Sequence, residues 1–128
     1  MSEYDIQAKE FLRRANATMT ITYIDRRKNT DWGDTFERPF FRVNITTPLG
    51  LYGFFFWGAV MDETVSEYDV LSCLEKYDYG SFNNFCNEFG YDNDSIKAYR
   101  TYEKCISQYR SLCKIFTTKQ MEELREIN

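Results

Sequence analysis

The spacing of the apolar residues changes once along this chain, and this change limits the folds that the chain can adopt. Between residues 18 and 57, apolar residues largely recur at every second position in three stretches, 18–25, 40–47 and 51–57, as in half-buried strands. After residue 64, and also within residues 2–15, they recur at every third or fourth position, as in amphipathic helices. A run of strands followed by a run of helices predicts an α+β domain.

Turn and capping residues divide these patterns into elements. Pro48-Leu49-Gly50 connects the last two strands closely, so we expect a three-stranded antiparallel sheet, with a long polar loop over residues 26–39. The expected helix starts are Ser2, Thr64 in a Thr-x-x-Glu capping box with Ser66 as a competing cap, Ser81, Asp94 or Ser95, and Thr117 in a second capping box. These signals predict an N-terminal helix, the sheet, and three to four helices packed on one sheet face. We expect one compact domain over residues 1–128.

The residue types exclude several kinds of chemistry. The chain has no histidine, which removes catalysis by Cys–His and Ser–His pairs. The four cysteines form no C-x-x-C pair and lie at or beside apolar helical positions, so we expect reduced, mostly buried thiols at Cys73, Cys86, Cys105 and Cys113. The longest apolar run, residues 51–61, is too short to span a bilayer, and the charged N-terminus has no apolar signal region. We therefore predict a cytoplasmic protein that is not an enzyme and has no catalytic residues, metal or cofactor.

Negative charge is concentrated between Asp62 and Asp94, where nine acids accompany one base, Lys76, in a chain with a net charge of −4. We expect Asp92 and Asp94 to cap the start of the long helix. Other acids form a candidate partner-binding face, which would compete with nucleic acid for a basic groove of the partner. These residues are Glu67, Asp69, Glu75, Asp78 and Glu88. Ten tyrosines add side chains that suit a protein interface. The alternative is that these acids only cap helices and keep the protein soluble.

Basic residues offer a second candidate surface. They gather in the polar loop and on one face of the expected helix 95–116, so the candidate residues for binding nucleic acid are Arg26, Arg27, Lys28, Lys97, Arg100 and Lys104. The acidic balance of the whole chain favours a solvated helix face instead. The run Asp92-Asn93-Asp94-Ser95 resembles the start of a calcium loop, but the required glycine is absent and Ile96 follows, so we expect no metal there.

Two motifs carry a family resemblance. YDVL-x-CL-x-KYD, from Tyr68, and FC-x-EFGYD-x-DS, ending at Ser95, resemble a group of small proteins from phages and prophages of Gram-positive bacteria. The resemblance covers most of the chain except residues 26–39. It implies a phage-encoded accessory protein that acts inside the host. By analogy, such a protein inhibits host defence, as anti-CRISPR proteins do, and its partner is a host protein such as a CRISPR effector or another nucleic-acid-handling complex. The remaining alternative is a structural or virion-assembly protein.

Overall fold

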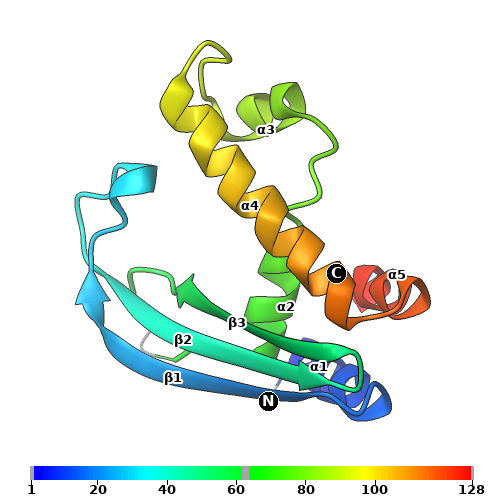
Figure 1. Ribbon diagram of the computed structural model, residues 1–128. Coiled ribbons are helices and arrows are strands. Elements are labelled where there is room, and N and C mark those ends of the chain that lie inside the picture. Colours follow the sequence, from blue (N-terminus) through cyan, green and yellow to red (C-terminus); the bar gives the residue numbers. More distant parts are fainter. Residues whose placement is uncertain (1, 62–63, 128) are drawn as a thin grey trace.

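The computed structural model describes residues 2–61 and 64–127, apart from the side chain of Asp31. Figure 1 shows the predicted α+β architecture, which is confirmed: an N-terminal helix, a three-stranded sheet, and then the remaining helices. The elements are α1 (Glu3–Arg14), β1 (Thr18–Arg27), the 3-10 turn η1 (Thr30–Trp32), β2 (Arg38–Thr47), β3 (Gly50–Trp57), α2 (Glu67–Glu75), α3 (Phe82–Phe89), α4 (Ile96–Ile115) and α5 (Thr118–Ile127).

The sheet is an antiparallel meander in the order β1-β2-β3. Its register pairs Ile21 with Val43 and Val43 with Phe54 on the face that packs against the helices. The neighbouring positions, among them Thr20, Asn44 and Gly53, lie opposite one another on the other face, because successive side chains of a strand point to opposite sides. The described side chains on this second face are exposed or half-buried between residues 18–22, 42–46 and 51–57, so no helix covers it.

The first two strands are longer than their sequence patterns. A bulge between Tyr23 and Asp25 shifts the register, and pairing then continues to Arg27 opposite Arg38. Arg26 and Arg27, which were expected in the polar loop, therefore belong to β1. The bulge hides this continuation in the sequence, because an extra residue breaks the period-two alternation.

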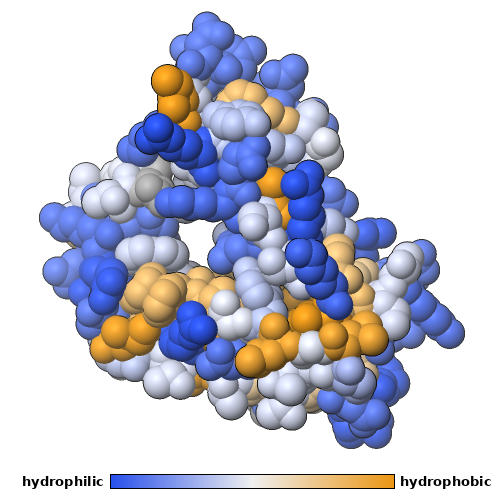
Figure 2. Space-filling model, in the orientation of Figure 1, coloured by the Kyte–Doolittle hydropathy of each residue, from blue (hydrophilic) through white to orange (hydrophobic). Residues whose placement is uncertain are grey.

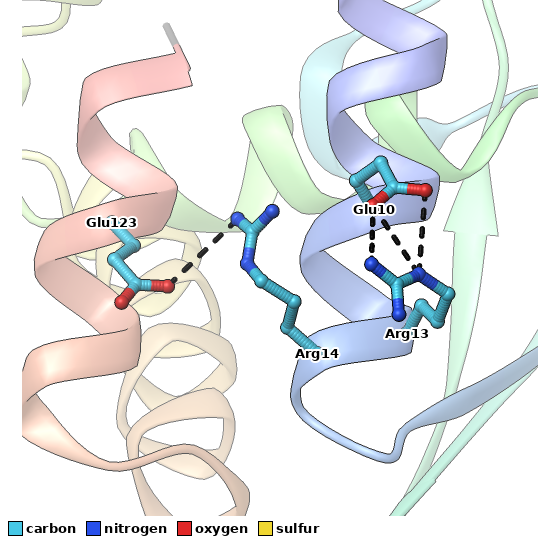
Figure 3. Close-up of polar contacts among 4 residues, drawn as sticks. All are labelled: Glu10, Arg13, Arg14 and Glu123. Carbon is cyan, nitrogen blue, oxygen red and sulfur yellow. Dashed lines mark hydrogen bonds and ion pairs between the residues drawn. The ribbon is translucent and has the colours of Figure 1, made fainter.

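The main core lies between the covered sheet face and the helices α1, α2, α5 and the C-terminal half of α4. Its fully buried side chains include Phe11, Val43, Leu71, Leu112 and Phe116. Burying a side chain of this size contributes about 1.5–3 kcal/mol each. Two pairs of charges border the contact of α1 with α5 (Figure 3): Arg13 turns back to Glu10 within α1, whereas Arg14 points to Glu123 of α5, with 4.0 Å between its Nη2 and the Glu123 Oε2.

A second, smaller core holds α3 against the N-terminal half of α4. We call residues 79–105 the arm, because Figure 1 shows α3 and the start of α4 extending beyond the sheet. The arm buries Phe85, Cys86, Ala98 and Cys105. Trp32 of η1 completes this cluster from the β1–β2 connection, with its ring centroid 4.9 Å from that of Phe89. The arm therefore has its own apolar cluster, which the half-buried Tyr77 joins to the core that packs on the sheet.

Candidate interaction surfaces

The first two acids of the predicted partner-binding face, Glu67 and Asp69, make contacts within the chain at the start of α2. The Glu67 carboxylate accepts a hydrogen bond from Lys9 Nζ of α1 at 3.1 Å. Ser66 caps the helix, because its side chain accepts the N–H of Asp69, and the Asp69 carboxylate accepts the N–H of Ser66 at 3.0 Å. The capping box is thus formed by Ser66 with Asp69, not by Thr64 with Glu67, and it accounts for the acid at position 69.

Glu75, the third of these acids, is buried at the C-terminal end of α2, with 8% of its surface exposed. Its Oε1 lies 3.2 Å from Nε of Arg125 on α5, and the hydrogen bond to Glu75 raises the pKa of the Arg125 guanidinium. A carboxylate in this place ties α2 to α5. Glu75 therefore does not contribute to an exposed negative face.

The last two acids of the set, Asp78 and Glu88, are both exposed, but they belong to different elements. Asp78 is in the α2–α3 connection; burial raises the pKa of the Tyr109 hydroxyl of α4 to about 12, and the charge of Asp78 adds to this rise. Glu88 lies near the end of α3, in the arm, and acts on the hydroxyl of Tyr79. The five predicted residues are therefore divided between the start of α2, a buried ion pair and two exposed positions, and they do not form one continuous surface.

A shorter acidic segment lies at the α3–α4 turn, within residues 88–96. Ser95 caps α4 by accepting the N–H of Ala98 at 3.1 Å, while Asp92 accepts the N–H of Asp94 at 3.0 Å, so the cap of α4 is Ser95 and not Asp94. Glu88, Asp92 and Asp94 are exposed and form no ion pair within the described part of the chain. We call the surface formed by these acids with Phe89 and Ile96 the tip surface.

The tip surface also carries exposed apolar groups and a small hollow. Phe89 is 39% exposed and Ile96 is 71% exposed. In Figure 2, orange lies among blue at the top of the molecule, where α4 begins. A hollow of about 420 Å³ lies at the same α3–α4 turn and is lined by Asn83, Cys86, Asn87, Tyr91, Asp92 and Asn93. Amide and carboxylate oxygens in such a lining accept hydrogen bonds from a lysine or arginine side chain.

The predicted basic residues are also not one surface. Arg26 donates hydrogen bonds to the carbonyl oxygens of Glu37, at 3.1 Å, and Val60. Its guanidinium therefore joins β1 to the residue before β2 and to the segment after β3. Arg27 forms an ion pair with Asp25 at 2.6 Å, and Lys28 is exposed. On α4, Lys97 and Arg100 are exposed near the tip, while Lys104 lies farther along the helix beside a larger hollow.

The four thiols are free, as expected, but they differ in exposure. Cys86 and Cys105 are buried and Cys73 is half-buried, whereas Cys113 is exposed. Burial raises the pKa of the Cys105 thiol to about 12 and also raises that of Cys73, so both are protonated at neutral pH. Among residues 2–61 and 64–127, no group of three or more His, Cys, Asp or Glu side chains is placed to hold a metal ion. Within the same residues, none of the helices is both long and apolar enough to cross a membrane.

Comparison of the chain with protein-family models, with curated proteins and with solved structures finds no match. The assignment of a function therefore depends on the surfaces of the molecule. The sequence located the acids of the tip surface but assigned two of them to helix capping. It did not identify Phe89 and Ile96 as exposed, because both occupy positions in apolar helical patterns.

Proposed function

We propose that this protein is a non-enzymatic interaction module that binds a host nucleic-acid-handling protein through the tip surface. The supporting observation is that Glu88, Asp92 and Asp94 are exposed and form no ion pair in the described structure, and that Phe89 and Ile96, within the same stretch of residues 88–96, are also exposed. No base occurs between Lys76 and Lys97. In line with the resemblance to phage proteins, the module is an inhibitor of host defence whose partner is a CRISPR effector or another complex with a basic groove.

The physical basis is charge complementarity around an apolar centre. A basic groove that has evolved for phosphate also attracts carboxylates, which steer association and make it dependent on salt. The apolar side chains then contribute through burial, at about 25 cal/mol per Å² removed from water. An ion pair at the rim of an interface contributes about 0.2–1 kcal/mol, so three pairs together contribute about 0.6–3 kcal/mol, which is about a half to two factors of ten in affinity.

The experiment compares two triple charge reversals of equal size. The test variant combines Glu88→Lys, Asp92→Lys and Asp94→Lys, and the control variant combines Glu37→Lys, Glu122→Lys and Glu126→Lys, which are exposed elsewhere in the fold. The partner is first captured from the host with the tagged parent protein, identified by mass spectrometry and purified. At about 50 mM salt we expect the test variant to bind this partner at least tenfold more weakly than the parent, and the control variant to bind as the parent does. Equal binding by all three proteins contradicts the proposal.

A competition measurement separates inhibition from simple association. If the tip surface occupies the nucleic-acid groove of the partner, the parent protein displaces a labelled oligonucleotide from it, and the test variant does so only at concentrations at least tenfold higher. A ternary complex that retains the oligonucleotide rules out occupation of the groove.

A further inference from the structure

A second hollow lies away from the tip surface, where α4 leaves the sheet. It has a volume of about 990 Å³, and Figure 2 shows it as an opening with the sheet below and α4 on its right. The sheet contributes Phe40, Phe55 and Trp57, which form the floor, and Phe56, which faces the helix-covered side. The β1–β2 connection and the middle of α4 supply the other walls, with Asn29, Trp32, Asp34, Arg38, Thr101, Lys104 and Gln108.

The floor is a layer of aromatic rings on the uncovered face of the sheet. Phe40 pairs with Trp57 across β2 and β3, and Phe55 is the next residue of β3 on the same face. The ring of Phe40 lies 5.1 Å from that of Phe55, nearly parallel to it at 16°, and 4.5 Å from that of Trp57. Phe55 is 49% exposed. The layer thus presents planar apolar surface to whatever enters the hollow.

Two arginines lie over these rings. The guanidinium carbon of Arg27 is 4.3 Å from the centre of the Phe40 ring, and that of Arg42 is 5.1 Å from the centre of the Phe55 ring. Arg27 is paired with Asp25, whereas Arg42 has no carboxylate partner within the described residues. Because the chain's own cations already occupy these π faces, a cationic ligand is disfavoured there. A guanidinium plane instead binds phosphate and stacks on flat rings.

The acids near the hollow are already engaged. Asp34 accepts hydrogen bonds from Arg38 Nε at 2.7 Å and from the N–H of Asn29 at 3.1 Å. Glu103 is hydrogen-bonded to the Tyr99 hydroxyl, which raises the pKa of that hydroxyl. These contacts leave the positive charge of Arg42 at the border of the aromatic floor.

The hollow adjoins the open face of the sheet, because Phe55 lines the hollow and also belongs to that face. Gly53, between Phe55 and Leu51 on this face, leaves room for the side chains of Arg42 and Asn44. A Cβ at this position would lie 2.6 Å from Oδ1 of Asn44 and in closer conflict with the Arg42 guanidinium. The absence of a side chain at Gly53 therefore allows the Arg42 guanidinium to lie against β3, with its carbon over the Phe55 ring.

We propose that the hollow and the adjoining open face of the sheet bind a single strand of nucleic acid. One base stacks on the half-buried ring of Trp57, and the neighbouring phosphate pairs with Arg42, which the Phe55 ring supports from below. The backbone then follows the uncovered face past Asn44 and Thr20, whose polar side chains bind phosphate or sugar oxygens. This site is separate from the tip surface, and it differs from the basic residues that the sequence suggested.

The chain provides its own reporter for this site, since its only two tryptophans, Trp32 and Trp57, both line the hollow. We expect saturable quenching of tryptophan fluorescence by an oligothymidylate of about ten nucleotides at about 50 mM salt, with an affinity that falls about two- to threefold as the salt rises to about 200 mM, since one phosphate contact carries the charge dependence. Thymidine monophosphate is the second ligand. The proposal is overturned if the strand causes no saturable quenching, or if the mononucleotide binds as tightly as the strand.

Variants assign the binding to this face. Arg42→Ala and Phe55→Ala should each weaken binding of a labelled strand at least tenfold by anisotropy. Gly53→Ala should also weaken it, because a methyl group displaces the Arg42 guanidinium, while the circular dichroism spectrum stays that of the parent. The matched control is Arg110→Ala, which removes the same charge from an exposed position on α4 outside the hollow. An equal loss in Arg42→Ala and Arg110→Ala indicates attraction by net charge alone and refutes the proposal. The triple reversal of the tip surface should leave strand binding unchanged, so the two proposals can fail separately.

Discussion

Replacing Phe85 with alanine should unfold the arm while the rest of the protein stays folded. Phe85 is fully buried, and its ring lies within 5.8 Å of those of Tyr79, Phe89, Tyr91 and Tyr102. It belongs to the cluster of the arm and not to the core on the sheet. Truncation of a buried phenylalanine costs about 3–5 kcal/mol, as the sum of lost burial and the cavity that remains. We expect this loss to lower the free energy of unfolding of the arm and not that of the main core.

The size of the expected effect distinguishes one cooperative unit from two. For a domain of this length, unfolding in urea has an m-value of about 2 kcal/mol per M. If the whole chain unfolded together, a loss of 3–5 kcal/mol would lower the midpoint by about 1.5–2.5 M. If the arm opens separately, the transition of the arm moves to low urea and that of the main core shifts by less than about 0.5 M.

The two tryptophans make this difference measurable. In a Trp57→Phe background, the remaining Trp32 reports the arm, because its ring lies among Phe85, Phe89 and Tyr91. Far-ultraviolet circular dichroism reports all helices and the sheet. We expect the fluorescence transition of Phe85→Ala to precede the dichroism transition. The control is Val43→Ala in the fully buried sheet core, which should move both transitions together. Coincident transitions that shift equally in Phe85→Ala refute the separate arm.

Three further predictions follow from single groups. Arg125→Ala removes an ion-pair partner of buried Glu75 and should lower the free energy of unfolding, measured in urea, by about 1–2 kcal/mol. The control Arg110→Ala should stay within about 0.5 kcal/mol of the parent. Equal stabilities of the two variants contradict a stabilising role for the pair. Ellman's reagent at pH 8 should label one thiol quickly in the folded protein, that of exposed Cys113, and Cys113→Ser should remove this fast phase; labelling of several thiols at one rate would refute it. Burial raises the pKa of Cys105 from 9.0 and of Tyr79 from 10.0, each to about 12, so the folded state favours their neutral forms. The free energy of unfolding should therefore stay constant below about pH 9 and fall as the pH rises toward 12. A constant Tm between pH 9 and 11 contradicts this.

Local signals in the sequence predicted the elements well, because each one depends on residues that are close in the chain. The Thr117 box forms as expected, with the N–H of Thr117 donating to Gln120 Oε1 at 2.8 Å and the N–H of Gln120 donating to Thr117 Oγ1 at 3.1 Å. Ser81 caps α3, and Gly90 ends it with a φ of 71°, a conformation that glycine adopts without steric cost. Such contacts span three or four residues, so a one-dimensional pattern contains them completely.

The roles of charged residues could not be predicted in the same way, because their partners are distant in the chain. Glu75 and Arg125 are fifty residues apart, and Glu67 pairs with Lys9 across 58 residues. The position of an acid on a helix does not tell whether the facing surface is solvent or another helix. The sequence therefore placed Glu75 on an exposed face, although the packing of α2 against α5 buries it.

The separation of the two cores, and with it the hollow, follows from the length of α4. At about 1.5 Å per residue, the twenty residues of α4 span about 30 Å, and only the part toward its C-terminus packs in the main core, through Leu112 and Ile115. The apolar stripe continues on the N-terminal half, which has no sheet beneath it and must be covered by α3 and Trp32 through Ala98 and Cys105. The sequence shows one uninterrupted stripe, because the period of a helix records which face is buried and not which partner covers it. Where the partner changes from the sheet to α3, neither one fills the space below α4, and the aromatic floor of Phe55 and Trp57 stays open.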